Sequence, residues 1–177
     1  MPSRLNETLD GRVLIKACEL DIPDSGRRDL PDSILARPGL KVCAVHYKFA
    51  LSRELQTERI LRAMDNPNLN VLAHPTGRLI NQRPPDEVDL ERLIRAARDK
   101  GRFMELDAHP GRLDPTNEAC LMEREIGLKV AISDDAHSTS SLDFMRFGMD
   151  QARRGWLSAE DVLGTRSLRA LRRLLRR

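Results

Sequence analysis

Short apolar runs recur along the chain, and each is followed by polar residues and then by apolar residues spaced as on one face of a helix. Such runs predict buried strands, and the spaced residues predict amphipathic helices. Five strands are expected, over Val13–Asp21, Lys41–His46, Leu69–His74, Phe103–Leu106 and Lys129–Ser133. Strands that alternate with helices predict an α/β fold with a parallel sheet. A complete eight-unit barrel needs about 250 residues, so about five βα units predict a smaller open sheet or part of a barrel.

Capping residues indicate where the intervening helices begin and end. Ser52 has the position of an N-cap before the most regular apolar stripe, and Asp114 has that position before a proline. The expected helices cover Leu30–Leu35, Ser52–Met64, Asp86–Arg98, the stretch from Asp114 to Gly127, Ser141–Arg153, and a segment that opens after Leu157 with Ser158 and Asp161 as a capping box.

The composition is that of one globular domain: 177 residues, of which 40% are apolar and 3% aromatic. No apolar run is long enough to span a bilayer, and the first residues lack the apolar core of a signal peptide. We therefore expect a cytoplasmic protein without a membrane partner. Three cysteines without C-x-x-C spacing are expected to stay reduced. The formal net charge of +3 permits a phosphate-bearing substrate without demonstrating one.

The four histidines share one position in this pattern. Each follows an apolar, β-prone run and precedes a polar loop; they are His46, His74, His109 and His137. Because the carboxyl ends of parallel strands meet at one edge of a sheet, these side chains can converge there. Histidines with purely structural roles would not be expected to share one topological position.

Asp135 and His137 follow the last expected strand directly. In an extended segment, residues two apart point to the same side, and a carboxylate with an imidazole makes a plausible pair of metal ligands. The alternative is a loop that caps the following helix.

Several segments resemble the polymerase and histidinol phosphatase (PHP) domain, in the version found at the C-terminus of bacterial family X DNA polymerases. They are ELD (19–21), AVHYKF (44–49), LSRELQTERILRA (51–63), LAHPTGRL (72–79), DAHSTSSLDFMRFG (135–148) and ARRGWLSAEDVLGT (152–165). The resemblance implies a distorted βα barrel with a cluster of metal ions at its C-terminal rim. It implies that the metal ligands are Glu19, His46, His74, Asp135 and His137.

The resemblance assigns Glu19 as a carboxylate that bridges two metals. Manganese, zinc or iron would suit the five ligands, and ligand type does not choose among them. Arg78, in a glycine-containing loop, could hold a phosphate by its planar fork, and it is expected with Asp135 and His137 in the catalytic group. The alternative for Arg78 is an ordinary surface arginine. Arg112 and Asp107 are weaker candidates for a place in the same phosphate-binding site.

Two other polar residues have less defined roles. Asp134 could orient a ligand histidine or bond to the backbone at the strand end. His109 is not assigned as a ligand, because the family often has asparagine or histidine at its position.

The family opens with a strand carrying His-x-His, whereas this chain has no histidine before His46. Residues 1–177 are therefore expected to form one domain that corresponds to the C-terminal two-thirds to three-quarters of the family domain. The remaining N-terminal portion, or an upstream polymerase, would be a partner, and by resemblance DNA would be another.

The resemblance implies a metal-dependent phosphoesterase that acts on DNA ends as a 3′–5′ exonuclease or in related processing. A non-catalytic structural or interaction module, and a phosphatase of the histidinol phosphatase type, are the alternatives. The tail from Ser167 has leucines on one face and arginines on the other, so it is either a helix that caps the domain or a contact for nucleic-acid backbone.

Overall fold

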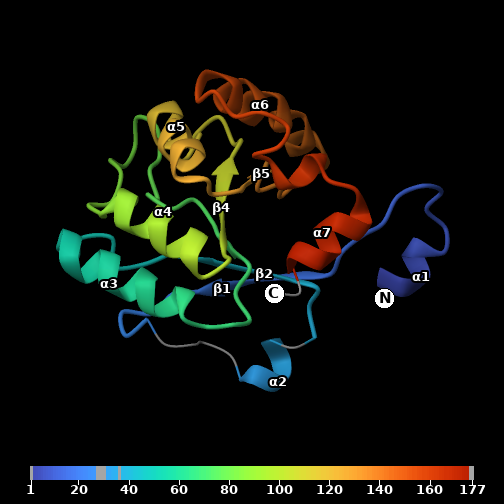
Figure 1. Ribbon diagram of the computed structural model, residues 1–177, viewed down its shortest axis with the longest axis horizontal. Helices are drawn as coiled ribbons and strands as arrows, with labels where there is room; N and C mark the ends of the chain where they lie inside the picture. The colour runs from blue at the N-terminus through green and yellow to red at the C-terminus, as the bar shows by residue number, and fades with distance from the viewer. Residues whose placement is uncertain (1, 27–30, 36, 176–177) are drawn as a thin grey trace.

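Five parallel strands form a single sheet in the order β1-β2-β3-β4-β5. The computed structural model describes residues 2–26, 31–35 and 37–175. The strands are β1 (Ala17–Asp21), β2 (Leu40–Ala44), β3 (Val71–Leu72), β4 (Phe103–Asp107) and β5 (Val130–Ser133). Sequence order and spatial order coincide, and helices connect the strands (Figure 1). The predicted α/β class with five βα units is confirmed.

The helices form two layers around the sheet. They are α1 (Pro2–Asn6), α2 (Asp32–Leu35), α3 (Arg53–Met64), α4 (Leu90–Asp99), α5 (Asn117–Ile126), η1 (Thr139–Phe144), α6 (Met145–Arg154), η2 (Leu163–Thr165) and α7 (Leu168–Leu175). In Figure 1, α3, α4 and α5 follow one another along one side of the sheet, and α7 lies on the other. Among the described residues, none of these helices is long and apolar enough to cross a membrane.

Alternate strand residues serve the two faces, as the pleat requires. The face under α3 and α4 is packed by Cys43, Leu72 and Met104. The opposite face carries Val71 and Phe103, which pack against Leu163 of η2 and against leucines of α7, among them Leu175. The register places Glu19 beside Val42, and therefore on this second face, together with Glu105 and Asp107 of β4.

Arg59 of α3 is a charged residue with no exposed surface. Its guanidinium donates to the backbone carbonyls of Ile22, Tyr47 and Lys48. A buried charge is costly unless it is hydrogen-bonded, and here carbonyls of the loops after β1 and β2 bond to both Nη atoms, whereas Nε is buried without a hydrogen-bond partner among the described residues. Arg59 thereby fixes the two segments that immediately follow Asp21 and His46.

Several predicted boundaries are wrong for identifiable reasons. β1 begins at Ala17 and not at Val13; Val13 and Leu14 are exposed, and the backbone of Leu14 bonds to the Asn6 side chain. β3 contains two residues of the predicted Leu69–His74. The predicted short helix begins at Asp32, and Leu30 lies outside the described residues.

Two acidic residues that were expected to begin helices are used elsewhere. Asp86 accepts a hydrogen bond from the Gln56 side chain at 2.7 Å, and α4 begins later, with Asp89 as its N-cap. Asp114 is buried and accepts from the backbone N–H and hydroxyl of Thr76, so α5 is capped by Thr116. By contrast, the predicted N-cap Ser52 is confirmed, and Gly127 ends α5 in a left-handed conformation (φ 85°).

The C-terminal part also departs from its prediction. Ser158 and Asp161 form a hydrogen-bonded turn, not a helix start, and Val162 then pairs with Val130 at the edge of the sheet. The helix expected over Ser141–Arg153 is divided into η1 and α6. The amphipathic helix predicted from Ser167 onward is confirmed as α7.

Candidate metal centre

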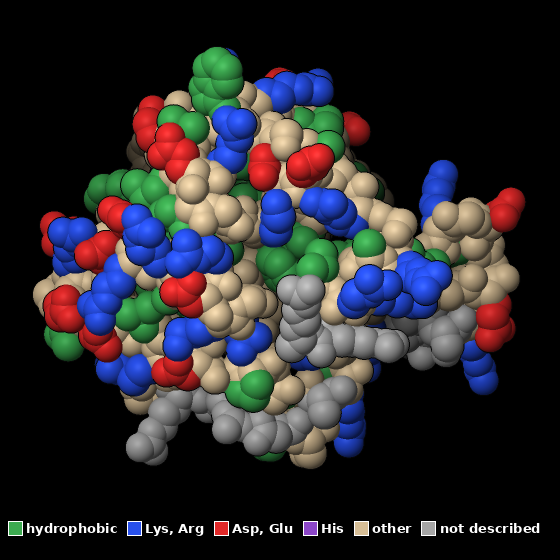
Figure 2. Space-filling view, viewed as in Figure 1, with side chains coloured by type: hydrophobic (Ala, Val, Ile, Leu, Met, Phe, Trp, Pro, Cys, Tyr) green, Lys and Arg blue, Asp and Glu red, His purple; other side chains and the backbone are tan. Residues whose placement is uncertain are grey.

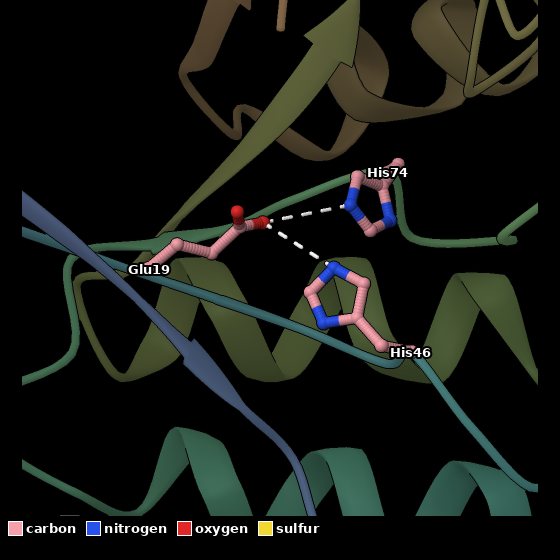
Figure 3. A group of neighbouring side chains, drawn as sticks. All are labelled: Glu19, His46 and His74. Atoms are coloured by element: carbon pink, nitrogen blue, oxygen red, sulfur yellow. Dashed lines mark ion pairs between the residues drawn. The ribbon is translucent and has the colours of Figure 1, made fainter. Parts of the chain in front are cut away.

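The C-terminal ends of β1, β2 and β3 bring one carboxylate and two imidazoles together. Nε2 of His46 lies 3.7 Å from Oε1 of Glu19, and Nε2 of His74 lies 3.6 Å from the same oxygen. Figure 3 shows both rings with a nitrogen turned toward the Glu19 carboxylate. The two rings are nearly edge to face, with centroids 5.3 Å apart. Three of the five predicted ligands therefore converge.

Local structure explains this convergence. Glu19 projects from within β1, whereas the histidines come two residues after the last strand residue of β2 and β3. His74 adopts a positive φ of 28°, and its backbone N–H donates to Oε2 of Glu105 at 2.8 Å. The carboxylate of Glu105 thus holds the turn that directs the His74 ring back toward Glu19.

A carboxylate also orients the other imidazole. Nδ1 of His46 bonds to Oδ1 of Asp21, which leaves Nε2 facing Glu19. A histidine whose second nitrogen bonds to a carboxylate is the usual arrangement around protein-bound zinc and related metals. Nδ1 of His74, in contrast, is buried without a hydrogen-bond partner.

The carboxylates and imidazoles of the cluster shift one another's pKa values. The polar contact with His74 is the largest cause of the lowered pKa of Glu19, and the charge of His46 adds to it. Burial acts to lower the pKa of His74, but the contact with Glu19 and the charge of Glu105 raise it above its usual value. Burial raises the pKa of Glu105 to about 7, although the Ser133 hydroxyl donates to it.

The residues present fit a divalent metal. Glu19, His46 and His74 each offer one ligand atom, and these atoms lie within 4.8 Å of one another. Ligand atoms in a tetrahedral site with bonds of about 2.1 Å are about 3.4 Å apart, close to the two observed separations from Glu19. Two imidazoles and a carboxylate with a further open position are the donor set of catalytic zinc sites.

The structure does not bring the last two predicted ligands into this group. Asp135 is in a left-handed conformation (φ 46°) in the loop after β5, and Nδ1 of His137 bonds to its backbone oxygen at 2.7 Å. The His137 side chain is 84% exposed. The Asp135 side chain is less exposed, at 28%, and its charge adds to the burial that raises the pKa of Asp107. Convergence of all five side chains, as the sequence predicted, is therefore not observed in the described structure.

The two candidate arginines make different contacts. Nε of Arg78 donates to the Arg112 carbonyl at 2.8 Å, and Nη2 donates to the Leu113 carbonyl, so Arg78 anchors the loop after β4. Arg112 lies with Nε 3.3 Å from Oδ2 of the buried Asp107, and its charge lowers the pKa of Glu19. Arg112, whose charge acts on Glu19, is therefore better placed to meet an anionic substrate than Arg78, whose guanidinium donates to backbone carbonyls.

The remaining polar candidates have structural contacts. Nδ1 of His109 accepts from the Gly111 N–H, and its ring lies against Phe144, which agrees with leaving it out of the ligand set. Within the part of the chain that the structure describes, no hydrogen bond joins Asp134 to a candidate ligand. Asp21 and Glu105 take the orienting role that was suggested for Asp134.

Comparison with known proteins agrees with this architecture. No protein-family model matches the chain. The DNA polymerase/3′-5′ exonuclease PolX of Bacillus subtilis is 35% identical over 173 residues, which cover 98% of this chain and 30% of that protein. A probable phosphatase of Thermoanaerobacter sp. is 28% identical over 153 residues, covering 81% of this chain and 59% of that protein.

A solved structure matches with a TM-score of 0.58, over 88% of this chain and 72% of the other. It is the histidinol phosphate phosphatase of Lactococcus lactis, in complex with zinc, L-histidinol and phosphate, and its sequence identity is 12%. The chain shares its fold with this phosphatase. It spans less than a third of the polymerase and somewhat more than half of the probable phosphatase, so the activities of those whole proteins come to this chain only as proposals.

Proposed function

We propose that the chain is a PHP-type domain with metal-dependent phosphoesterase activity, and that it acts on DNA ends in the manner of a 3′–5′ exonuclease. The observation that carries the proposal is the cluster of Glu19, His46 and His74 at the carboxyl edge of the parallel sheet. The choice of DNA is supported by the 35% identity to PolX along nearly the whole chain.

In this proposal Glu19, His46 and His74 hold the metal, and Asp21 keeps the His46 ring in its orientation. A bound divalent metal supplies Lewis acidity to a phosphoryl oxygen and lowers the pKa of water. Arg112 offers a guanidinium fork to the phosphate oxygens, and its contact with Asp107 holds that fork in place. Manganese, zinc and iron all suit the donors.

Asp135 and His137 enter the proposal as groups that join the site when substrate or further metal is bound. Their loop must rotate to do so, because His137 is at present directed to solvent. We also propose that residues 1–177 are one domain equivalent to the C-terminal two-thirds to three-quarters of a full PHP domain. The further partner would then be the polypeptide that completes the barrel.

A second candidate function, hydrolysis of a small phosphomonoester, is supported by the similarity to probable phosphatases and by the fold shared with histidinol phosphate phosphatase. The third candidate is a non-catalytic structural or interaction module. It is supported by the small number of converging ligands: among the described residues, three of the five predicted ligands come together.

One experiment separates the three candidates. The purified chain, alone and together with the polypeptide that completes the barrel, is loaded with Mn²⁺ or Zn²⁺, and binding is measured by calorimetry alongside hydrolysis of end-labelled single-stranded DNA and of histidinol phosphate. His74→Ala should abolish metal binding and any hydrolysis, whereas His109→Ala should retain both. Metal binding that survives His74→Ala would overturn the proposed centre, and hydrolysis of histidinol phosphate in preference to DNA would favour the phosphatase function.

A further inference from the structure

The helix α7 carries a basic face that the proposed phosphoesterase site does not use. The described residues of α7 include no acidic side chain, and its exposed positions are Arg169, Arg172 and Arg173. Among the described residues, no hydrogen bond or ion pair engages these three guanidinium groups. Figure 2 shows Lys and Arg side chains gathered over α7, whereas over α3 and α4 they alternate with Asp and Glu. The described part of the chain therefore does not neutralise the basic face.

The position of α7 is fixed by the sheet. Nδ2 of Asn70 donates to the Leu175 carbonyl at 3.0 Å, while Oδ1 of Asn70 accepts the Lys41 N–H at 2.9 Å. One asparagine thus holds the end of α7 against the amino ends of β2 and β3, at the opposite end of the strands from His46 and His74. The arginines are presented on a rigid support, so binding an anion requires no ordering of the helix.

A hollow of about 480 Å³ lies beside this helix end, and its lining combines Arg172 with Lys16 and Lys41. No acidic residue is among its described lining residues. Lys41 lies at the amino end of β2, Gly39 immediately precedes that strand, and Lys16 immediately precedes β1. Three cations from three separate parts of the chain therefore surround one polar hollow that is continuous with the basic face of α7.

The apolar side of α7 helps to identify the partner. Leu171, Leu174 and Leu175 pack against Val71 and Phe103. A basic amphipathic helix binds a membrane by burying its apolar face in the lipid, and here that face is already occupied by the core. What remains exposed is a set of arginines, whose planar forks suit phosphate oxygens. Among the described residues that line the hollow, none is aromatic and able to stack on a base, so contacts would go to the phosphates without sequence preference.

We propose that Arg169, Arg172 and Arg173, with Lys16 and Lys41, form a docking surface for the phosphodiester backbone of DNA, away from the metal centre. The proposal rests on the proposed action on DNA ends and gives that function a second contact with its substrate. A surface of this kind retains the strand through charge while the end is processed elsewhere, and its affinity depends on salt concentration.

Binding of a fluorescently labelled single-stranded DNA is measured by anisotropy over a range of salt concentrations, with EDTA present to prevent cleavage. In the variant Arg169→Gln/Arg172→Gln/Arg173→Gln, the dissociation constant at low salt should rise on the order of tenfold. The slope of log affinity against log salt should fall by about 0.7 for each phosphate contact that is lost. Lys16→Gln/Lys41→Gln should act in the same direction.

The matched control removes the same charge from α4, in Arg92→Gln/Arg95→Gln/Arg98→Gln. These arginines are paired with Glu54 and Glu58, with Glu91 and with Asp99, so DNA affinity should stay near that of the parent protein. Equal weakening in both triple variants would mean that net charge alone binds DNA and would overturn the proposal, as would no weakening in the α7 variant.

Two further measurements distinguish DNA from a membrane as the partner, and the docking surface from the metal centre. Vesicles of phosphatidylserine and phosphatidylcholine should bind more weakly than DNA; tighter vesicle binding that the α7 variant loses would assign the surface to a membrane instead. His74→Ala should bind DNA as the parent protein does. A chain that binds DNA through α7 and still fails to hydrolyse it after the polypeptide that completes the barrel has been added would therefore refute the proposed function without refuting the docking surface.

Discussion

Glu123 is a carboxylic acid in the core whose two oxygens have no hydrogen-bond partner among the described residues. It lies in α5 and has no exposed surface. Burial, with a smaller effect of the charge of Asp114, raises the pKa of Glu123 from its usual 4.5 to about 8. Folding therefore takes up a proton at neutral pH. The stability contributed by the neutral form is complete below about pH 4.5 and is lost as the pH rises through the folded value.

The magnitude follows from the two pKa values. One unit of difference corresponds to about 1.4 kcal/mol, so the linked cost reaches about 3 kcal/mol at pH 7 and about 5 kcal/mol well above pH 8. Glu123→Gln retains the shape of the neutral acid and has no proton to release. The variant should match the parent protein near pH 4.5 and exceed its free energy of unfolding by about 3 kcal/mol at pH 7.

The measurement is urea unfolding followed by far-ultraviolet circular dichroism, at several values between about pH 4.5 and 8.5. Other titrating groups are common to both proteins and cancel in the difference. Glu125→Gln, an exposed change on the same helix, should stay within about 0.5 kcal/mol of the parent protein at every pH. A constant difference between Glu123→Gln and the parent across this range would show that Glu123 does not titrate there and would refute the reasoning.

Three further predictions concern packing and the metal centre. A Cβ at Gly148 would stand 2.6 Å from Cβ of Ala108, so Gly148→Ala should lower the free energy of unfolding by about 1–3 kcal/mol, whereas Gly164→Ala, which meets nothing within 4 Å, should be nearly neutral in the same urea titration. Asp21→Asn should weaken metal affinity by about 10–100-fold in calorimetry, because it changes the group that orients His46; an unchanged affinity would contradict this role. The isolated chain should show little or no exonuclease activity with added Mn²⁺ or Zn²⁺ and should gain it when the proposed missing units are added; robust digestion by the chain alone that is lost in His74→Ala would contradict this expectation.

The sheet was predictable because the apolar runs mark the strands and a histidine follows four of those runs. The exact ends of the strands and helices were less predictable. Val13 and Leu14 read as strand from their side chains, yet they lie where Asn6 binds the backbone of Leu14 and no strand forms. Asp114 reads as a helix cap, and its burial against Thr76 is a tertiary contact that local sequence does not contain.

The residues of the candidate site were also predictable only in part. His46 and His74 were predictable because each follows a strand at the same edge of the sheet, whereas Glu19 was predicted as a ligand only through the family resemblance. Glu105 was missed, although an acid inside the otherwise apolar run at 103–106 was the available signal. Asp135 and His137 were expected on the same side of an extended segment, and Nδ1 of His137 does lie 3.7 Å from Oδ1 of Asp135. The segment is not extended, however, because Asp135 has a positive φ, and the His137 side chain is exposed to solvent.

The three converging ligands differ in how deeply they are held. The His74 side chain is 4% exposed, whereas those of Glu19 and His46 are 44% and 40% exposed. The cluster is therefore closed on the side of β3 and open on the side of β1, which pairs within the described residues with β2 alone. A metal held there would meet water on the open side, and water weakens the electrostatic interactions that stabilise developing charge on a phosphate. Any structure that covers the outer edge of β1 would thus improve the site in two ways, by excluding water and by placing further ligands beside Glu19. This is the physical reason to expect catalysis to depend on more than the three ligands that converge in this chain.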